Sequence, residues 1–426
     1  MKKIREGYKM TELGEIPSEW EVKKLKDLGN SVIGLTYSPD DLVDGCNGTL
    51  VLRSSNIRNN RIVFDDNKYV NKDIQEKLIV KENDILICSR NGSKELIGKC
   101  ALIDKKAEGS SFGAFMTVYR SKYNKYLFNV FTSYMFKRQI YNNLGATINQ
   151  ITTDNLNNFK IIVPTIKEQE KISSILSTVD EQIDNVDVLI KKNKELKKGL
   201  MQTLLTKGIG HTKFKKTEIG EIPEEWEVVK FFDFVDKIID FRGRTPKKLG
   251  MDWGNGNIQA LSANNVKMGE IDFSLECYLA SEELYKKWMS GNELVIGDIL
   301  MTMEAPLGNI ALVPDERKYI LSQRVIALKT REFINNKFMK YMLMSDVVQN
   351  QLDKLSTGTT AKGINQKNLA RVYVKIPVIQ EQEKIASILS EVDKKIDGYE
   401  NKKQKLEELK KGLMQQLLTG MIRVTV

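Results

Sequence analysis

The sequence predicts an internally duplicated α+β protein, in which two related globular domains are separated by two long helices. Residues 11–22 read TELGEIPSEWEV and residues 217–228 read TEIGEIPEEWEV, with 10 of 12 positions identical. Residues 168–206 and 381–419 share 25 of 39 residues, and both have the apolar spacing of a coiled coil. The stretches between each opening and each long segment agree far less. A constant frame around divergent domains predicts one scaffold that presents two related surfaces.

Short apolar segments bounded by Gly, Asn, Asp and Ser follow each opening, and this punctuation predicts β-strands. In the first copy they are residues 51–57, 83–89, 99–103 and 114–120, and in the second copy residues 258–263, 297–303, 309–313 and 324–329. Helical patterns follow at residues 126–143 and 336–352. Each copy then closes on a strand-like KIIVP or VKIP. We therefore expect each globular domain to be of the α/β type.

A long helix is predicted after each domain, because apolar residues recur there at alternating spacings of three and four. The expected seams are Ile172, Leu176, Val179, Ile183, Val186, Ile190, Leu196, Leu200 and Leu204, and Ile385, Leu389, Val392, Ile396, Tyr399, Leu406, Leu409, Leu413 and Leu417. Pro164 and Pro377 precede the helices, and Gly208 and Gly420 follow them. Since one helix cannot bury such a stripe alone, we expect an antiparallel coiled coil, with the two domains in a pseudo-two-fold relation.

These elements divide the chain into four parts. A first domain at residues 1–163 is followed by a first helix at 164–207, a linker and second domain at 208–376, and a second helix and tail at 377–426.

Composition places the protein in a broad class. Lys and Arg outnumber Asp and Glu by 66 to 56, which gives a net charge of +10 and suits a polyanionic partner without demanding one. No apolar run approaches the roughly 18 residues of a membrane span, and the first ten residues lack the apolar core of a secretion signal. Four cysteines without a CxxC pair are typical of reduced thiols. A cytoplasmic protein without a membrane partner is expected.

Three polar segments recur at equivalent places in both domains and are rich in groups that bond base edges or phosphates. Residues 52–61 match 261–270, residues 89–99 match 303–309, and residues 145–156 match 358–369. In addition, TYSPDD at 36–41 stands where the second copy has the basic RGRTPKK at 242–248. A single Asn or Ser in a loop is more often a turn residue, but three matched loops favour a DNA-binding surface. The expected DNA contacts are Arg53, Ser55, Asn56, Arg58, Arg90, Asn91, Lys94, Asn149, Gln150, Arg242, Arg244, Lys247, Lys248, Asn264, Asn265, Lys267, Thr359, Thr360, Lys362, Asn365 and Gln366.

The near-identity of the two helices extends to positions that a coiled coil would leave outward. Glu168 and Gln169 recur as Glu381 and Gln382. Packing along the seam does not demand identical outer residues, so we expect these four side chains to dock a partner that binds the helices symmetrically.

Catalytic motifs are missing from the sequence. It has neither a GxxxxGK[ST] phosphate loop nor a GxGxxG turn after a strand. The only histidine, His211, lies in a polar linker, and PDERK at 314–318 is expected to be a surface turn. We therefore expect no catalytic residue, metal or cofactor in this chain. Two alternatives remain: a methyltransferase or nuclease with an unrecognised site, and a stand-alone bivalent DNA-binding regulator.

A family resemblance rests on the EQEKI-type helix that ends in KKGLMQ and LLT, the linker into TEIGEIPEEW, and the second copy of the whole arrangement. Over nearly the whole chain this pattern resembles specificity subunits of type I DNA restriction–modification enzymes. The resemblance implies two target-recognition domains, each reading one half of a split, asymmetric site in double-stranded DNA. It implies that the helices set the spacer and dock two methyltransferase (modification) subunits, which restriction subunits join. S-adenosylmethionine, ATP and Mg would then be bound by those partners.

Overall fold

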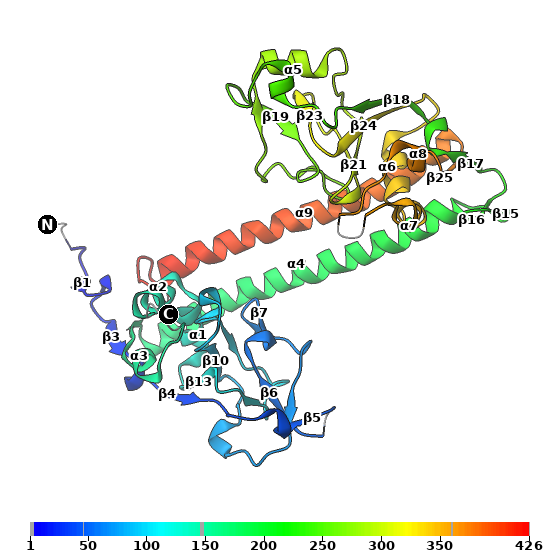
Figure 1. Ribbon diagram of the computed structural model, residues 1–426. Helices are drawn as coiled ribbons and strands as arrows, with labels where there is room; N and C mark the ends of the chain where they lie inside the picture. Colours follow the sequence, from blue (N-terminus) through cyan, green and yellow to red (C-terminus); the bar gives the residue numbers. More distant parts are fainter. Residues whose placement is uncertain (1–3, 46, 145–148, 359–360, 426) are drawn as a thin grey trace. The chain divides into compact units, whose positions relative to one another are not determined.

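The computed structural model describes residues 4–45, 47–144, 149–358 and 361–425. It divides into two compact units, which are residues 1–186 with 402–426 (the first unit) and residues 187–401 (the second unit). Each unit therefore joins one globular domain to a part of each long helix. The predicted fold class, a duplicated α+β domain with two long helices, is confirmed (Figure 1).

The first unit is built around two four-stranded sheets. One sheet is antiparallel, in the order β11–β10–β13–β4, and the other has the order β12–β6–β9–β5 with a parallel β12–β6 pair. Its strands are β1 (Tyr8–Thr11), β2 (Gly14–Pro17), β3 (Glu21–Lys24), β4 (Asn30–Ile33), β5 (Leu42–Val43), β6 (Thr49–Leu52), β7 (Ile57–Arg58), β8 (Arg61–Ile62), β9 (Tyr69–Val70), β10 (Ile85–Cys88), β11 (Cys100–Leu102), β12 (Ser111–Phe112), β13 (Met116–Arg120) and β14 (Lys160–Val163). Its short helices are α1 (Asn124–Thr132), α2 (Tyr134–Asn143) and α3 (Thr153–Asn158).

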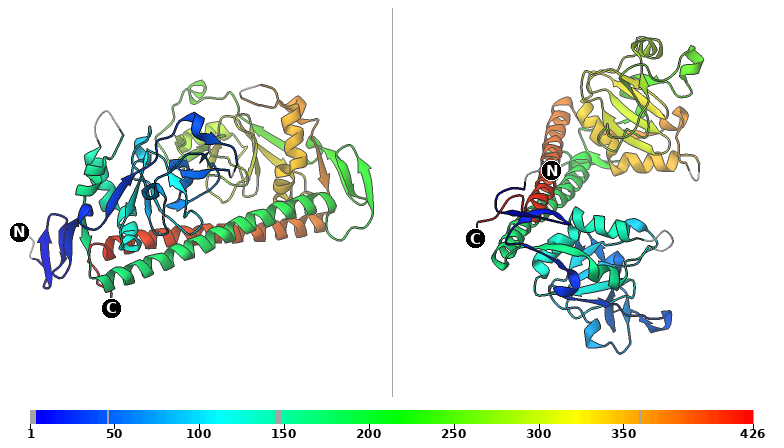
Figure 2. Two further views of the ribbon diagram at one scale, coloured as in Figure 1. Left: turned by 90° about the horizontal axis from the view of Figure 1, so that it is seen from below. Right: turned by 90° about the vertical axis from the view of Figure 1, so that its left-hand side faces the viewer.

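The second unit repeats this strand order, with one strand fewer in its second sheet. Its antiparallel sheet β18–β24–β21–β22 matches β4–β13–β10–β11, and its sheet β20–β19–β23 again contains one parallel pair. The strands are β15 (Phe214–Thr217), β16 (Gly220–Pro223), β17 (Glu227–Lys230), β18 (Val235–Asp240), β19 (Ile258–Leu261), β20 (Leu279–Ala280), β21 (Ile299–Met303), β22 (Leu307–Leu312), β23 (Tyr319–Leu321), β24 (Val325–Thr330) and β25 (Tyr373–Ile376). The helices are α5 (Glu282–Met289), α6 (Asn336–Met344), α7 (Asp346–Leu355) and α8 (Gln366–Leu369). The duplication is thus visible in topology, and a matching hairpin, β1–β2 or β15–β16, opens each copy (Figure 2).

Two predicted single helices are each divided in the structure. The pattern at 126–143 forms α1 and α2, and the pattern at 336–352 forms α6 and α7. The break falls at Ser133 and Ser345, whose backbones are extended. Each hydroxyl donates to a carbonyl in the preceding turn, and that of Ser133 also accepts from the Phe136 amide. Ser133 therefore ends one helix and caps the next with its side chain, whereas Ser345 occupies the same position without a side-chain cap bond.

The long helices are α4 (Ile166–Lys207) and α9 (Ile379–Leu417), with 42 and 39 residues (Figure 1). Their pairing is antiparallel within the second unit, where Lys194 binds Glu400 and Lys197 binds Asp393. The residue numbers of the paired positions rise along α4 and fall along α9, so the two helices run in opposite directions. The first unit holds an equivalent ion pair between Asp180 and Lys410.

Two leucines were wrongly assigned to the seam. Leu196 and Leu409 are 52% and 51% exposed. The alternation of three and four continues from Ile190 through Asn193 and Lys197 to Leu200 instead, so a lysine takes the seam position beside Leu196. Lys197 and its counterpart Lys410 are only 21% and 17% exposed, because each pairs with an aspartate of the facing helix.

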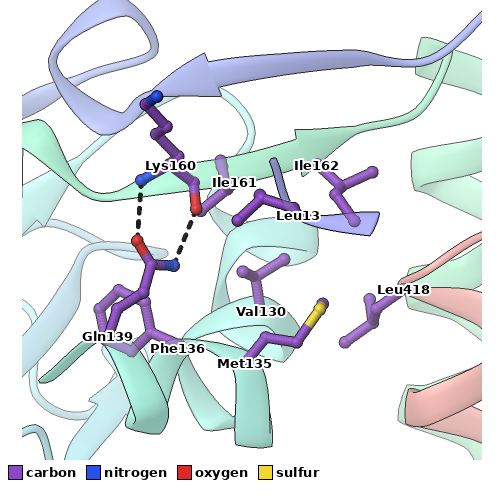
Figure 3. Close-up of a pocket in the computed structure, with 9 residues that line it drawn as sticks. All are labelled: Leu13, Val130, Met135, Phe136, Gln139, Lys160, Ile161, Ile162 and Leu418. Atoms are coloured by element: carbon purple, nitrogen blue, oxygen red, sulfur yellow. Dashed lines mark hydrogen bonds between the residues drawn. The ribbon is translucent and has the colours of Figure 1, made fainter. Parts of the chain in front are cut away.

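A glutamine attaches one short helix of each domain to the strand that precedes the long helix. Gln139 in α2 donates to the carbonyl of Lys160 (2.8 Å) and accepts from its amide (3.0 Å), as Figure 3 shows. Gln351 in α7 makes the same two bonds with Tyr373. The pocket beside Gln139 has a volume of about 10 Å³, space for a single water at most, so it is a packing gap and not a ligand site.

Candidate nucleic-acid interface

Of the three pairs of polar loops, two begin at the ends of buried strands. We call the three pairs loop 1 (52–61 and 261–270), loop 2 (89–99 and 303–309) and loop 3 (145–156 and 358–369). Loop 1 follows β6 or β19, and loop 2 overlaps or follows the end of β10 or β21. Rigid strands thereby fix where loops 1 and 2 begin.

The three loops meet in the first unit. Asn91 of loop 2 donates to the Ser54 hydroxyl of loop 1 (3.2 Å), and Lys99 donates to the Ser54 carbonyl (3.2 Å). Asn149 of loop 3 donates to the Gly92 carbonyl (3.0 Å). Three segments far apart in sequence therefore form one polar surface.

The same three loops meet in the second unit. Asn309 of loop 2 donates to the Val266 carbonyl of loop 1 (2.9 Å). The Ile364 amide of loop 3 donates to the carbonyl of Met303 (3.0 Å), and a backbone bridge joins Glu304 to Gly363. The convergence is thus a property of the repeated fold.

Two asparagines expected to contact DNA have a structural role instead. Asn56 and Asn265 are 0% and 1% exposed. Asn56 accepts from the Arg53 amide (3.0 Å) and donates to the Val63 carbonyl (3.1 Å). Asn265 makes the equivalent bonds to the Ser262 amide and to backbone carbonyls beyond it. These amides hold the loop 1 turn closed and cannot reach a base from the interior.

The loop 1 arginines of the first unit already have acidic partners. Arg53 binds Asp66 at 2.8 Å, and its positive charge holds the pKa of that carboxyl below its usual value. Arg58 binds Asp65 at 2.8 Å, with both side chains more than half exposed. Ser55 is exposed beside them. The exposed Arg58–Asp65 pair is weak and can be exchanged for a phosphate or a base, whereas Arg53 is half-buried.

The loop 2 and loop 3 residues of the first unit are more open. Arg90 is exposed, and its guanidinium lies 5.3 Å from the ring centroid of Phe115. A backbone bridge joins Arg90 to Gln150. Asn91 and Asn149 are half-buried in the contacts between loops, and Lys94 is exposed.

The basic 242–248 segment joins loop 3 in the second unit. Arg242 binds Asp240 at 2.7 Å, and Gln366 donates to the same carboxylate at 3.2 Å. Burial tends to raise the pKa of Asp240, but the bonds from Arg242 outweigh it and leave that pKa lowered. Arg244 donates to the Trp288 carbonyl, so its charge faces inward.

The remaining expected contacts of the second unit are placed as follows. Lys247 and Lys248 are exposed on a 3-10 turn that begins at Pro246, just as Pro39 begins the matching turn at 39–41. Asn264 and Lys362 are exposed, with Lys362 paired to Asp353, and Lys267 is half-buried. Asn365 caps α8 by accepting from the Asn368 amide (2.8 Å). Thr359 and Thr360 lie outside the described residues.

Three further exposed residues, which the sequence did not indicate as DNA contacts, lie in loop 2 or bond to its first residue: Phe115, Glu304 and Arg324. Phe115 resembles a core residue because it directly precedes a buried strand. The one available signal was the alignment of loop 2, which sets Glu304 opposite Arg90.

The expectation that Glu168 and Glu381 dock a partner is wrong. Glu168 is fully buried, and it accepts hydrogen bonds from Trp20 (2.8 Å) and Arg423 (2.6 Å). The side chain of Glu381 is 11% exposed; it accepts from Trp226 (3.0 Å) and lies 3.0 Å from His211 Nε2. Both lie in the first turn of a long helix, where the helix meets its own domain.

Gln169 and Gln382 are buried for the same reason. Gln169 donates to the Pro164 carbonyl (2.8 Å), and Gln382 donates to that of Pro377 (2.9 Å). Gln382 also accepts from the Asn335 amide (2.9 Å). The identity of these residues in both copies reflects a shared internal anchor and needs no docking partner to explain it.

The described part of the chain holds no group of three or more His, Cys, Asp or Glu placed to bind a metal. Asp315 of the PDERK turn is held by Arg317 at 2.8 Å, and this bond lowers the pKa of Asp315 to about 2. No described helix is both long enough and apolar enough to cross a membrane.

Comparison with known proteins gives a consistent assignment. Residues 17–198 and 223–408 each match the family model described as type I restriction modification DNA specificity domain. The type I restriction enzyme MjaVIII specificity subunit of Methanocaldococcus jannaschii is 30% identical, over 98% of this chain and 96% of that protein. The EcoKI specificity subunit of Escherichia coli is 23% identical, over 87% and 82%.

Two solved structures share the fold. The S subunit of a type I restriction–modification system from M. genitalium matches with a TM-score of 0.58 at 15% identity, covering 95% of this chain and 97% of that one. A chain from a structural study of type I R-M assembly and conformational transition matches with a TM-score of 0.54 at 17% identity, covering 96% and 99%.

Proposed function

This chain belongs to the type I restriction–modification DNA specificity family, and on that premise we propose that each of its domains reads one half of a split, asymmetric DNA site. The observation that carries the proposal is the convergence of loops 1, 2 and 3 into one polar surface in both units. Side chains with free donors and acceptors on such a surface can read base edges, while Lys and Arg bind phosphates. The divergence of these loops between the copies would make the two half-sites different.

Catalysis belongs, in this proposal, to partner subunits. Two modification subunits would bind S-adenosylmethionine and methylate the DNA, and restriction subunits would use ATP and Mg. The chain itself would act as a non-catalytic cytoplasmic subunit that selects the sequence. Helices α4 and α9 would set the number of base pairs between the half-sites.

Partner docking is reassigned to identical helix positions that are exposed. Glu170 and Lys171 in α4 recur as Glu383 and Lys384 in α9, and all four are exposed. They lie within four residues of the buried anchors, so the same helical turn binds its own domain with one face and can offer another to a partner.

The decisive experiment is methylome sequencing of the source cell with and without this gene. We expect one split, asymmetric methylated motif to disappear when the gene is deleted. An unchanged methylome in a strain that expresses the modification subunit would contradict the proposal.

Two assays separate the proposal from its alternatives. Purified chain incubated with DNA and labelled S-adenosylmethionine should transfer no methyl group until the modification subunit is added. Transfer by the chain alone would support an enzyme. Tight specific binding by the chain alone, without a co-purifying methyltransferase, would support a stand-alone regulator.

A further inference from the structure

Arg90 and Glu304 occupy the same place in the two units. Each lies two residues after the last residue of β10 or β21 that pairs with the neighbouring strand, which is Cys88 (paired with Met116) or Thr302 (paired with Val325). The amide just before Arg90 donates to the carbonyl of Phe115 (3.0 Å), and the amide just before Glu304 donates to the carbonyl of Arg324 (2.8 Å). Phe115 and Arg324 are therefore equivalent too.

Loop 3 confirms this equivalence independently. The Ile151 amide donates to the Ser89 carbonyl (2.8 Å), and the Ile364 amide donates to the Met303 carbonyl (3.0 Å). Backbone bridges then join Arg90 to Gln150 and Glu304 to Gly363. Strand, neighbouring strand and loop 3 all give the same alignment.

The side chains at these equivalent places have opposite chemistry. In the first unit a cation, Arg90, lies over the exposed ring of Phe115, which is 58% exposed. In the second unit a carboxylate, Glu304, lies 3.5 Å from the guanidinium of Arg324, and the two side chains are 49% and 51% exposed. The backbone arrangement is the same in both units, but Arg90 carries a positive charge where Glu304 carries a negative one.

The loop 3 residue that bridges to Arg90 or Glu304 also differs between the two units. Gln150 of the first unit is replaced by Gly363, and a Cβ added at Gly363 would lie 3.1 Å from the Cβ of Glu304. The glycine thus leaves room for the carboxylate.

Internal structure does not account for these exposed groups. Within the part of the chain that the structure describes, Arg90 has no carboxylate partner, whereas the nearby Arg53 and Arg58 do. The long, half-exposed Glu304–Arg324 pair is of a kind that adds little stability.

We propose that Arg90 and Glu304 are equivalent specificity-determining residues, with Arg90 reading a guanine in the first half-site and Glu304 a cytosine in the second. The inference rests on the proposed function and deepens it. A guanidinium donates two hydrogen bonds to guanine O6 and N7, and a carboxylate accepts from cytosine N4.

Phe115 and Arg324 act as positioning residues. The ring of Phe115 restricts the guanidinium of Arg90 through a cation–π contact. Arg324 holds Glu304 through its ion pair. Neither needs to touch a base itself.

The test is selection of bound sequences from randomised duplex DNA by the full chain in complex with its modification subunit. The wild type should select one split motif with a guanine in one half and a cytosine in the other. R90E should change a guanine of the first half to cytosine, and E304R should change a cytosine of the second half to guanine. K94E is the matched control, because it makes the same charge reversal in loop 2 away from this place; it should weaken binding and leave the motif unchanged.

Milder variants keep the test valid where charge reversal prevents assembly. R90K keeps the charge but loses the two parallel N–H donors of the guanidinium. The preference for guanine over the other bases at that position, about 5- to 150-fold for a bidentate contact, should therefore fall. F115A should reduce the same discrimination without changing the preferred base, and F115Y should restore it. E304Q should relax the preference for cytosine.

The outcomes are distinguishable. A wild-type complex that selects no split motif would refute the proposed function. A wild-type motif that stays the same, base for base, in R90E, E304R, R90K and E304Q would refute this inference and leave the function intact.

Discussion

Arg423 and His211 are different residues that complete the same carboxylate anchor. In the first unit Arg423 binds Glu168, and in the second unit His211 lies against Glu381, while a tryptophan donates to each carboxylate. Burial tends to raise the pKa of Glu168, but bonds from Arg423, Thr165 and Trp20 outweigh it and leave that pKa lowered. The anchor of the first unit therefore favours the ionised carboxylate.

We expect Glu168→Ala to lower the free energy of unfolding by about 2 kcal/mol, because the Trp20 and Arg423 donors lose a charged acceptor. Urea denaturation followed by tryptophan fluorescence measures the change. Glu170→Ala, at an exposed position two residues further along α4, is the control and should change stability by less than about 0.5 kcal/mol. Equal effects of the two substitutions would contradict the anchor.

Acid should weaken the same anchor. Since the pKa of Glu168 is lower in the folded than in the unfolded chain, its contribution is present above the unfolded carboxyl pKa and is lost as the pH falls through the folded value. Stability measured below about pH 4 should therefore decline more steeply in the wild type than in Glu168→Gln. Identical pH profiles would show that Glu168 does not contribute.

Single residues also show what the sequence could reveal. Loop 2 was identified from its composition, and it does carry the exposed Arg90. Asn56 has the same composition signal but is buried, because its amide closes a turn with residues up to eleven positions later. A sequence shows which groups can bond to a base, but not whether the backbone already uses them.

Among the larger elements, the long helices were predicted best. Their repeated apolar spacing extends over many turns, so one or two wrongly assigned positions do not change the prediction of a helix. At Leu196 and Leu409 the sequence pattern favours a leucine over the adjacent lysine, and only the facing helix shows that Lys197 and Lys410 have acidic partners there. Ser133 and Ser345 were missed as helix breaks because serine fits an exposed helical position equally well.

The ion pair between Lys197 and Asp393 gives a prediction at this scale. Asp393 also accepts from the Tyr341 hydroxyl (2.7 Å). We expect Asp393→Ala to cost about 2–3 kcal/mol, because it leaves a largely buried lysine unpaired. Glu400 lies in α9, as Asp393 does, and is the exposed partner of Lys194. Glu400→Ala should therefore lower the free energy of unfolding by less than about 1 kcal/mol.

An apolar replacement tests the role of this pair. The double variant Lys197→Met with Asp393→Leu should recover part of the lost stability in urea denaturation, since an apolar pair fits a seam, although the Tyr341 hydroxyl and Lys340 still lose their acceptor. If it were as unstable as Asp393→Ala, the unpaired charge of Lys197 would not be the cause of the loss.

At the scale of the whole molecule, each globular domain should be exchangeable if the long helices and the strand pair that joins the domain to them are left intact. Residues 30–158 lie between the β3–β14 pair and leave the Trp20–Glu168 contact in place. Replacing them with the equivalent domain of a relative should change only the first half-site, as read by methylome sequencing. The reciprocal replacement of residues 235–371 should change only the second, and a change in both half-sites from either replacement would refute independent reading.

The division of the chain between its two units has a consequence for synthesis. Residues 187–401 form one uninterrupted stretch, whereas the other unit needs residues 402–426 to be complete. A ribosome makes the earlier domain first, yet Glu168 cannot bind Arg423 until residues 187–401 have been translated. Domains usually finish folding in the order in which they are made. The second unit can therefore complete its folding first. The first unit, although most of it is translated earlier, completes its folding only after residues 402–426 are added.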